Sequence, residues 1–356
     1  MVKKRNSNRS ISRNTNMNVK ISNKYSKKRK LMKKKRKRKK FVKRLIGFII
    51  YEFLALIISG VLLTYYGPFK EVRSTLVGTA MATYKHQYIA TLFLSKDKIN
   101  EILNKDKSTP TIAENTGDIK INKNYGNSIE RYDISTSKFD GYILEIKNPK
   151  KIKTGYTKYM GKMGQRTSKI AEENGAIAAI NGGGFTDASS KGKLWTGTGA
   201  NPEGLVLSKG KIIHNNFKKG EKANVTAFTK EGLLIVGNHT VEELLNMGVT
   251  EALSFRNTLI INGQPIPYND GLNPRTAVGQ KKDGTVVFLV IDGRRDMKPG
   301  ATTEDVENIL LKRGVVNAGN LDGGSSSTMY YKGKVINRPA NWDGERTVAT
   351  VLYVEP

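Results

Sequence analysis

An uninterrupted apolar run near the N-terminus constrains this chain more than any other feature. The 22 residues from Leu45 to Tyr66 carry a single charge, that of Glu52. An α-helix of that length spans the hydrocarbon core of a bilayer, which is about 30 Å thick. Tyr65 and Tyr66 are suited to the far membrane interface. The run therefore predicts one transmembrane helix over residues 45–66.

The chain's net charge of +30 is concentrated before this run. Residues 1–44 hold 21 of the 61 Lys and Arg residues and none of the 31 Asp and Glu residues, which leaves 40 basic against 31 acidic elsewhere. So few apolar residues predict a disordered tail. The positive-inside rule places this tail in the cytoplasm and the chain beyond Tyr66 outside the cell. The basic block is also suited to contact anionic membrane lipid.

The same residues have other interpretations. A nucleic-acid-binding arm followed by a buried helix would share this composition, but buried helices are seldom so long and so apolar, so no nucleic-acid partner is expected. A cleaved signal peptide would have a shorter charged region and a small-residue cleavage site. Glu52 lies near one end of the span, where it fits helix association and simple tolerance equally.

Residues 67–127 predict a helical stalk and a linker. Apolar residues recur at helical spacing from Glu71 to Leu103, and Ser95 is placed to cap a second short helix. A polar segment with Pro110 follows. The chain has no Cys, so its outer domain is expected to be stable without disulfides, and its three His residues lack metal-ligand spacing. No metal or other cofactor is expected.

The remainder, residues 128–356, predicts one globular domain. Strand-like runs outnumber helical ones, and the helices are interspersed rather than strictly alternating. The pattern favours an α+β domain, dominated by strands, with a large mixed sheet. The clearest strands are expected at 139–146, 176–180, 233–238, 285–294 and 347–355, with a hairpin at 204–214, and the clearest helices at 164–175, 239–248 and 302–314.

Four of these apolar runs adjoin polar, glycine-rich loops, where function is expected. A single such turn is an ordinary way to reverse a chain. Together the four bring carboxylates, arginines, an amide and glycines, which are the groups needed to hold a phosphate and act on the carbon beside it. The loops are INGGGF (180–185), NPRTA (273–277), IDGR (291–294) and LDGGSSS (321–327).

These loops resemble the motifs of the phosphodiester glycosidase family. The resemblance runs from about Tyr142 to Val354 and includes AAINGGGF, NPRTAVGQKKDGTVVFLVIDGR and NLDGGSSSTMYYKGKVINRP. It ends with the pattern R-x-V-A-x-x-L at Arg346–Leu352. The resemblance implies cleavage of a sugar from a sugar-1-phosphodiester, which leaves a phosphomonoester on the acceptor.

Residue chemistry suggests how such a site would work. Phosphate is a good leaving group, so the site must mainly neutralise its charge and stabilise a cationic sugar carbon. Arg275 is the first candidate for the phosphate, because a guanidinium fork matches its oxygens, and Arg338 and Arg294 follow. Backbone N–H groups would add an anion nest: those of Gly323, Gly324 and Ser325.

Two aspartates are candidates for the base or nucleophile, Asp292 and Asp322, and which of them attacks stays open. Each is equally able to cap its own turn. Asn181 is a candidate for orienting a sugar hydroxyl, and Gly182 for close approach of a ligand to the backbone.

The predicted whole is a single-pass membrane protein whose extracellular domain hydrolyses a sugar-1-phosphodiester in a cell-surface glycopolymer, an exopolysaccharide, a cell-wall polymer or a glycoconjugate. Two other classes share the topology and the ligand. One is a phosphotransferase that attaches anionic glycopolymers to the cell wall. The other is a non-catalytic module that binds such a polymer.

Overall fold

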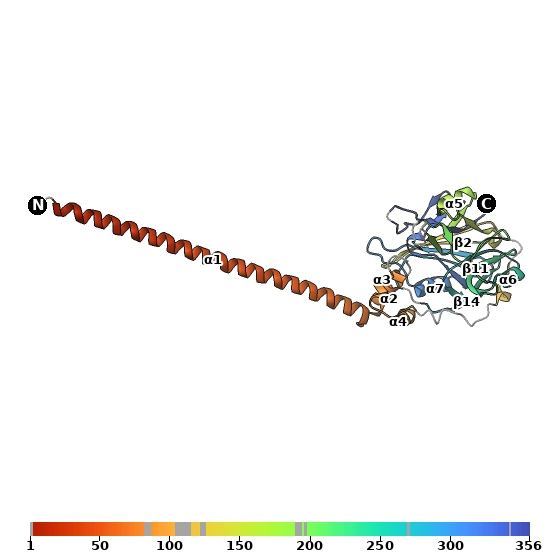
Figure 1. Cartoon of the computed structure of the whole chain (residues 1–356). Helices are drawn as coiled ribbons and strands as arrows, with labels where there is room; N and C mark the ends of the chain where they lie inside the picture. The colour runs from red at the N-terminus through yellow and green to blue at the C-terminus, as the bar shows by residue number, and fades with distance from the viewer. Residues whose placement is uncertain are drawn as a thin grey trace. The chain divides into compact units, whose positions relative to one another are not determined.

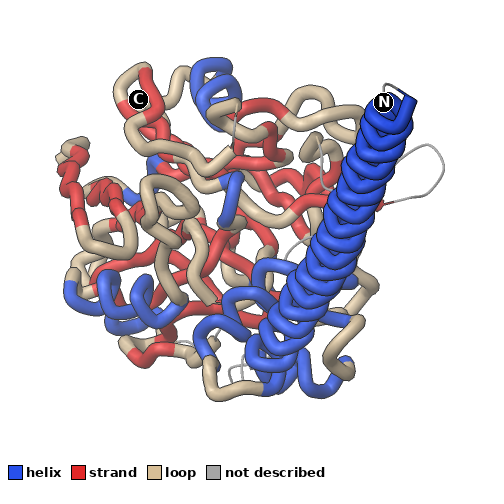
Figure 2. Tube along the Cα trace, turned by 90° about the vertical axis from the view of Figure 1, so that its left-hand side faces the viewer, coloured by secondary structure: helices blue, strands red, loops and turns tan. Residues whose placement is uncertain are grey.

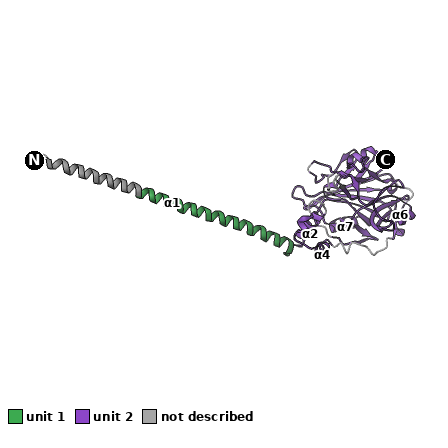
Figure 3. Cartoon of the chain, viewed as in Figure 1, with its two compact units in different colours: residues 1–68 green, residues 69–356 purple. Residues whose placement is uncertain are grey.

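The computed structural model describes residues 3–81, 87–103, 115–121, 126–188, 194–195, 198–268, 271–341 and 343–356. The chain divides into two compact units, residues 1–68 and residues 69–356, which are coloured separately in Figure 3. Each unit is described by itself.

The first unit is a single helix, α1 (Lys3–Tyr66), at the red end of Figure 1. Among the described residues, its part from Ser26 to Tyr66 is the one helix long and apolar enough to cross a membrane. None of its most apolar window is buried. Side chains such as Phe48 and Leu56 are exposed, which is expected of a lipid-facing helix and not of a core helix.

The predicted disordered tail differs from the structure. Helix α1 runs back through residues 1–44 as far as Lys3. Lys and Arg have high helix propensity, and neither Gly nor Pro occurs before Gly47 to interrupt the helix. Charge density and lack of apolar residues indicated that this segment has no core of its own, but they did not exclude helix.

The second unit begins with three short helices: α2 (Lys70–Met81), α3 (Tyr88–Thr91) and α4 (Lys96–Ile102). Ser95 caps α4 as predicted, because its hydroxyl accepts a hydrogen bond from the Lys98 N–H at 3.2 Å. The predicted stalk, however, belongs to the same compact unit as the domain. Ser74 and Val77 of α2 are buried.

Strands outnumber helices in the described part of the second unit, and Figure 2 draws them in red. The largest sheet has seven strands in the order β1-β2-β17-β16-β18-β14-β15. Their bounds are β1 Ile129–Ser135, β2 Asp140–Ile146, β17 Val286–Ile291, β16 Arg275–Lys281, β18 Val315–Leu321, β14 Thr258–Ile261 and β15 Gln264–Pro265.

Two five-stranded sheets accompany it, in the orders β10-β9-β13-β11-β12 and β20-β19-β5-β22-β3. Their bounds are β10 Lys211–Asn215, β9 Leu205–Ser208, β13 Val249–Ser254, β11 Ala223–Thr229, β12 Leu234–His239, β20 Lys334–Val335, β19 Met329–Tyr331, β5 Ala178–Asn181, β22 Thr350–Val354 and β3 Ile152–Tyr156. Smaller pairings join β4 Gln165–Arg166 with β21 Thr347–Val348, and β6 Phe185–Ala188 with β7 Leu194–Trp195 and β8 Asn201–Pro202.

The strand-dominated α+β class is confirmed, with one correction. Every strand pairing among the described residues is antiparallel, so the large sheet is not mixed. Hairpins connect many of its neighbours directly, as β16 and β17 show, and antiparallel neighbours need no helical crossover. Interspersed helices had suggested parallel pairs.

Three helices lie among the strands: α5 (Thr167–Glu173), α6 (Val241–Asn246) and α7 (Thr303–Lys312). Thr240 and Thr302 begin α6 and α7 with capping boxes, in which the threonine hydroxyl and a carboxylate three residues later exchange hydrogen bonds with backbone N–H groups. These helices confirm the predictions for 239–248 and 302–314.

The seven-stranded sheet buries side chains on both faces. One face joins a core shared with both five-stranded sheets, in which Leu144, Ile180, Val206 and Phe288 are fully buried. The opposite face packs under α7, with Leu289 buried against it. A strand covered on both faces reads as a continuous apolar run, which explains the sequence VVFLVI of β17.

Candidate active site

Three adjacent strands of the large sheet place three of the four predicted loops at the same end of the sheet. Strand β16 begins at Arg275, and its neighbours β17 and β18 end at Ile291 and Leu321. Ile291 pairs with Arg275, and Leu321 pairs with Thr276. The loops that follow β17 and β18 therefore leave the sheet on either side of the loop that enters β16.

The alternation of side chains separates the two candidate aspartates. Paired residues point to the same face of a sheet, and successive residues point to opposite faces. Asp292 follows Ile291 and so is directed to the face of Thr276. Asp322 follows Leu321 and is directed to the face of Arg275. The two aspartates accordingly line different cavities.

Asp322 lines a cavity of about 90 Å³ that we call the arginine cavity. Four arginines contribute to it, from segments far apart in the sequence. Its lining residues are Phe255, Arg256, Asn273, Pro274, Arg275, Arg294, Asn320, Leu321, Asp322, Gly323, Gly324, Ser325 and Arg346. Four guanidinium groups are chemically suited to bind an anion, and the one carboxylate is suited to stabilise a positive charge that develops beside that anion.

The Asp322 carboxyl is half-buried, and burial raises its pKa above the usual range. The Ser326 hydroxyl and the charges of Arg346 and Arg256 act in the opposite direction. The two arginines are thus close enough to the carboxyl to influence its ionisation. They favour the negatively charged form that a sugar cation would require.

Asn181 holds the Asp322 backbone in place. Its side-chain NH₂ donates to the Asp322 carbonyl at 2.5 Å, and its Oδ1 accepts from the Thr276 hydroxyl at 2.8 Å and the Thr328 N–H at 3.0 Å. The residue is fully buried. The predicted contact of Asn181 with a sugar hydroxyl is therefore replaced by a positioning role.

Gly182 also has a packing role. A Cβ at this position would lie 2.5 Å from the Thr350 hydroxyl, and the Gly182 carbonyl accepts from the Asp322 N–H at 3.0 Å. Glycine is needed here because β5 and β22 approach closely, and a ligand does not fill that space. Asn181 and Gly182, both in the INGGGF motif, thus hold the backbone of Asp322 at the end of β18.

Arg275 lines the arginine cavity but is occupied by the protein itself. Its side chain is 4% exposed, its Nε donates to the Ala301 carbonyl at 2.9 Å, and a terminal nitrogen donates to the Gly271 carbonyl. These two bonds use Nε and one of the two terminal nitrogens of the guanidinium group. Phosphate binding, for which Arg275 was the first candidate, is better served by its neighbours.

Arg294 lies against the loop after Asp322. A Cβ on Gly324 would sit 3.5 Å from an Arg294 terminal nitrogen, and another terminal nitrogen donates to Asn273 Oδ1 at 2.5 Å. Burial and the nearby Arg275 charge lower the pKa of Arg294. A bound anion would relieve this unfavourable placement of positive charge.

The predicted anion nest is partly used within the protein. The Gly324 N–H donates to the Pro274 carbonyl at 2.9 Å. A Cβ on Gly323 would lie 2.7 Å from the same oxygen, so glycine is required for this approach. Ser325 accepts from Arg346 at 3.4 Å. The loop after β18 therefore binds the backbone just before β16. The arginine side chains around this loop supply most of the positive charge of the cavity.

Two arginines of this cavity were missed in the sequence. Arg346 lies over the Phe185 ring, 4.8 Å from its centroid, which joins the C-terminal motif to the INGGGF loop. The motif R-x-V-A-x-x-L contained it, but nothing in the local sequence gave it a role. Arg256 follows the buried strand β13 by two residues, and this strand end is the signal that would have found it.

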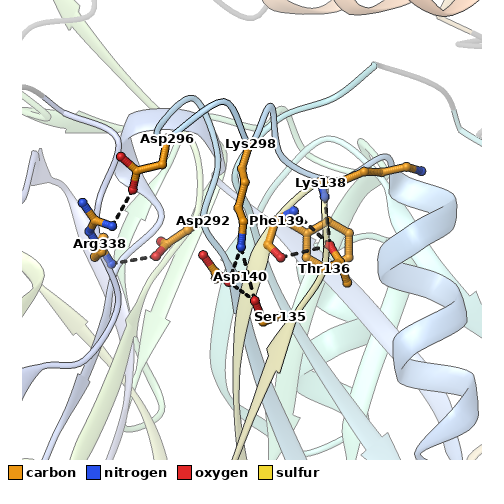
Figure 4. Close-up of polar contacts among 9 residues, drawn as sticks. All are labelled: Ser135, Thr136, Lys138, Phe139, Asp140, Asp292, Asp296, Lys298 and Arg338. Carbon is orange, nitrogen blue, oxygen red and sulfur yellow. Dashed lines mark hydrogen bonds and ion pairs between the residues drawn. The ribbon is translucent and has the colours of Figure 1, made fainter.

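Asp292 belongs to a second group of residues, which we call the Asp292 cluster; Figure 4 draws five of its members, Asp140, Asp292, Asp296, Lys298 and Arg338. Its carboxylate accepts from the Asn337 side chain and from the Arg338 N–H, both at 2.8 Å. Asn337 also donates to the Ser327 carbonyl and accepts from the Met329 N–H. The members of the cluster are Asp140, Asp292, Gly293, Arg295, Asp296, Lys298 and Arg338.

Arg338, another predicted phosphate ligand, lines the cavity of the Asp292 cluster and not the arginine cavity. Its guanidinium pairs with Asp296 at 2.5 Å, and both side chains are more than half exposed. Burial raises the pKa of Asp292, while the hydrogen bonds from Asn337 and Arg338 lower it. The carboxylate of Asp292 thus ties the end of β17 to the segment after the Asp322 loop.

A metal centre is not indicated. No three His, Asp or Glu side chains in the described parts of the chain are grouped so that they could hold an ion.

The chain is similar to several known proteins. The curated relatives include the SPbeta prophage-derived uncharacterized protein YomE of Bacillus subtilis (strain 168), 29% identical over 209 residues, which are 55% of this chain and 30% of that protein. The N-acetylglucosamine-1-phosphodiester alpha-N-acetylglucosaminidase of Bos taurus is 37% identical over 89 residues, 23% of this chain and 17% of the enzyme. The chain spans less than a third of the length of these relatives.

A solved structure shares the fold. The catalytic domain of the zebrafish N-acetylglucosamine-1-phosphodiester alpha-N-acetylglucosaminidase, auto-inhibited by its pro-peptide, superposes with a TM-score of 0.54 at 21% identity. The match covers 67% of this chain and 86% of that one. The sequence model for "Phosphodiester glycosidase" matches residues 174–355, half of the chain, and includes Asn181, Arg275, Asp322 and Arg346. The chain belongs to the phosphodiester glycosidase family.

Proposed function

We propose that this protein is a hydrolase that releases a sugar from a sugar-1-phosphodiester. The observation that carries the proposal is the arginine cavity, in which the Asp322 carboxyl lies among four arginines. Relatives named for cleavage of N-acetylglucosamine from a phosphodiester share the family. We propose a class of substrate and not a single compound: a sugar joined through its anomeric carbon to a phosphodiester.

The arginines bind the phosphate in this proposal. A phosphodiester carries one negative charge, which guanidinium groups hold by paired hydrogen bonds. Arg256 and Arg346 act on the Asp322 carboxyl, and Arg294 lies against Gly324, so these three surround the position beside that carboxyl. Arg275 supports the cavity wall through the Ala301 and Gly271 carbonyls.

The reaction then follows from where charge develops. The bond between the anomeric carbon and the phosphate oxygen breaks, and the oxygen keeps the electron pair as part of a phosphomonoester. The arginines stabilise that charge, and ionised Asp322 stabilises the cationic sugar carbon. Water adds to the carbon and loses one proton, so the products are a free sugar and a phosphomonoester.

The setting is a membrane anchor with the catalytic domain outside the cell. The apolar part of α1 and the basic residues before it support this orientation. A substrate in a cell-surface glycopolymer or glycoconjugate fits that location. Protease added to intact protoplasts should remove the domain beyond Tyr66 and spare the basic tail, and protection of the whole chain would contradict the topology.

A product assay tests the activity. The full chain is incubated with synthetic sugar-1-phosphodiesters, and free sugar and phosphomonoester are measured together. We expect equal amounts of both, with little turnover by Asp322→Asn. Transfer of a sugar phosphate to peptidoglycan without free sugar would show a phosphotransferase instead. Tight binding without any product, unchanged in Asp322→Asn, would show a binding module.

A further inference from the structure

Exposed apolar side chains gather in the segment that directly follows the predicted span. Among the described residues after Tyr66, five large hydrophobic side chains between residues 69 and 93 are exposed, whereas eight are spread over residues 129–356. The five are Phe69, Val72, Tyr88, Leu92 and Phe93, and Leu92 is 70% exposed. Such a concentration marks a surface that contacts something apolar.

The inner side of the same segment is packed into the domain. Ser74, Val77 and Ala80 of α2 are buried, at the helical spacing of one face. Phe69 and Val72 lie three residues apart just before that face and are exposed. Phe69, directly before α2, and Val72, in its first turn, therefore present apolar side chains outward where the chain enters the domain, as expected of a segment at an interface between protein and lipid.

Helix α2 also contacts the loop that enters the arginine cavity. The Thr75 hydroxyl accepts from the Leu272 N–H at 3.2 Å, and a side chain at Gly271 would collide with the Thr75 backbone. The Thr79 hydroxyl donates to Asn273 Oδ1 at 3.3 Å, the oxygen that also accepts from Arg294. One side chain, Asn273, thus links α2 to the cavity.

Chain length limits how far this loop can lie from the end of the span. Thr75 is nine residues beyond Tyr66. Nine residues reach at most about 30 Å when fully extended, and less with α2 helical. The contact of Thr75 with Leu272 therefore limits the distance between the loop at residues 271–273 and the end of the predicted span to about this length.

We propose that α2 and α3 rest in the outer membrane interface and present the arginine cavity to a lipid-linked glycosyl phosphodiester. The inference rests on the proposed function and names its substrate class. The phosphate of such a lipid lies at headgroup level, where the tethered loop holds the arginines. Hydrolysis breaks the bond between the anomeric carbon and the phosphate oxygen, consumes one water and leaves a free sugar and a lipid phosphomonoester. A diffusing glycopolymer would need no apolar surface beside the site.

The substrate test compares two phosphodiesters of the same sugar, a polyprenyl ester in vesicles and a water-soluble methyl ester. The full chain is reconstituted in vesicles of phosphatidylcholine and phosphatidylglycerol. Val72→Glu/Leu92→Glu places charges on the proposed lipid-facing side. We expect it to slow turnover of the polyprenyl ester by roughly tenfold or more, because the reacting groups are no longer held together. Turnover of the methyl ester should stay at the wild-type rate.

The matched control puts the same charges on exposed apolar residues elsewhere. Ile212 on β10 and Leu245 on α6 are 48% and 46% exposed. Ile212→Glu/Leu245→Glu should leave both rates unchanged. Equal polyprenyl ester rates for Val72→Glu/Leu92→Glu and the control would overturn the inference. Wild-type protein that cleaves neither ester would instead refute the proposed function.

Insertion of this segment into the membrane interface can be measured without an activity assay. Leu92→Trp is placed in the full chain, and fluorescence quenching by brominated lipids is compared with that of Leu245→Trp. The native tryptophans, Trp195 and Trp342, are common to both proteins. We expect added quenching only for Leu92→Trp. The same quenching in both proteins would show that Leu92, directly after α3, does not enter the interface.

Discussion

Asp322 and Asp292 each follow a buried apolar strand of the same sheet, and each is followed by glycine. Their surroundings nevertheless differ. Asp322 is influenced by two guanidinium groups from distant segments, those of Arg256 and Arg346. Asp292 is bound by an amide and a backbone N–H that tie neighbouring loops together.

The difference comes from strand register. Because β16 pairs with both β17 and β18, one residue of offset puts one aspartate on the Arg275 face and the other on the Thr276 face. Similar local motifs thus have different surroundings: Asp322 lines the arginine cavity, and Asp292 lies in a network of hydrogen bonds between loops. We infer that Asp322 reacts and that Asp292 positions the segment after it.

The largest expected effect is that of Asp322→Asn. The amide keeps the shape and the turn-capping oxygen but loses the charge that stabilises a sugar cation. We expect kcat to fall roughly a hundredfold or more, which is about 3 kcal/mol of transition-state stabilisation. Thermal unfolding should barely change. A fully active variant of lowered stability would make the Asp322 loop an ordinary turn.

Asp292→Asn should show the opposite pattern. The new NH₂ group faces donors, so one of the two hydrogen bonds from Asn337 and Arg338 is lost. We expect a loss of about 2 kcal/mol in the free energy of unfolding. Denaturant unfolding measures it, and kcat per folded molecule should stay within about threefold of wild type. A stable but inactive Asp292→Asn would reverse the two assignments.

Arg346→Lys tests the contribution of Arg346 to the arginine cavity, which the sequence analysis did not predict. Lysine keeps the charge but lacks the planar fork and its stacking on Phe185. We expect kcat/KM for a soluble sugar-1-phosphodiester to fall about tenfold, or about 1.4 kcal/mol. Arg338→Lys is the matched control in the Asp292 cluster and should have no effect. Equal losses in both would show that the phosphate contacts both groups of residues.

The smallest expected effect is that of Arg338→Ala. Its ion pair with Asp296 is exposed on both sides and therefore contributes little. Its backbone N–H, which binds Asp292, is unchanged by the substitution. Unfolding free energy should change by less than about 0.5 kcal/mol. A large loss of activity would restore Arg338 as a phosphate ligand.

Much of the fold could be predicted because it is local. Apolar runs gave the strands, and Thr240 and Thr302 marked the starts of two helices. The site was predictable in part: the loop after β18 and Arg294 were found, and both line the arginine cavity. These signals depend on residues near each other in the chain.

The rest depended on long-range packing. Arg256 and Arg346 reach the Asp322 carboxyl from other segments, and no local pattern announces that meeting. The Arg275 guanidinium donates hydrogen bonds to the Gly271 and Ala301 carbonyls, and only folding brings these carbonyls near it. The face of each aspartate depends on register, which the sequence alone leaves open.

The pH dependence of kcat/KM tests most directly which carboxyl reacts. Burial raises the pKa of both Asp322 and Asp292, so either would give an acid limb above the usual aspartate range near 3.9. Activity needs the ionised form, so kcat/KM should rise as pH increases through the raised pKa of Asp322. We predict that Asp292→Asn keeps this limb at its wild-type position. Loss of the limb in Asp292→Asn, with its retention in the residual activity of Asp322→Asn, would contradict the assignment.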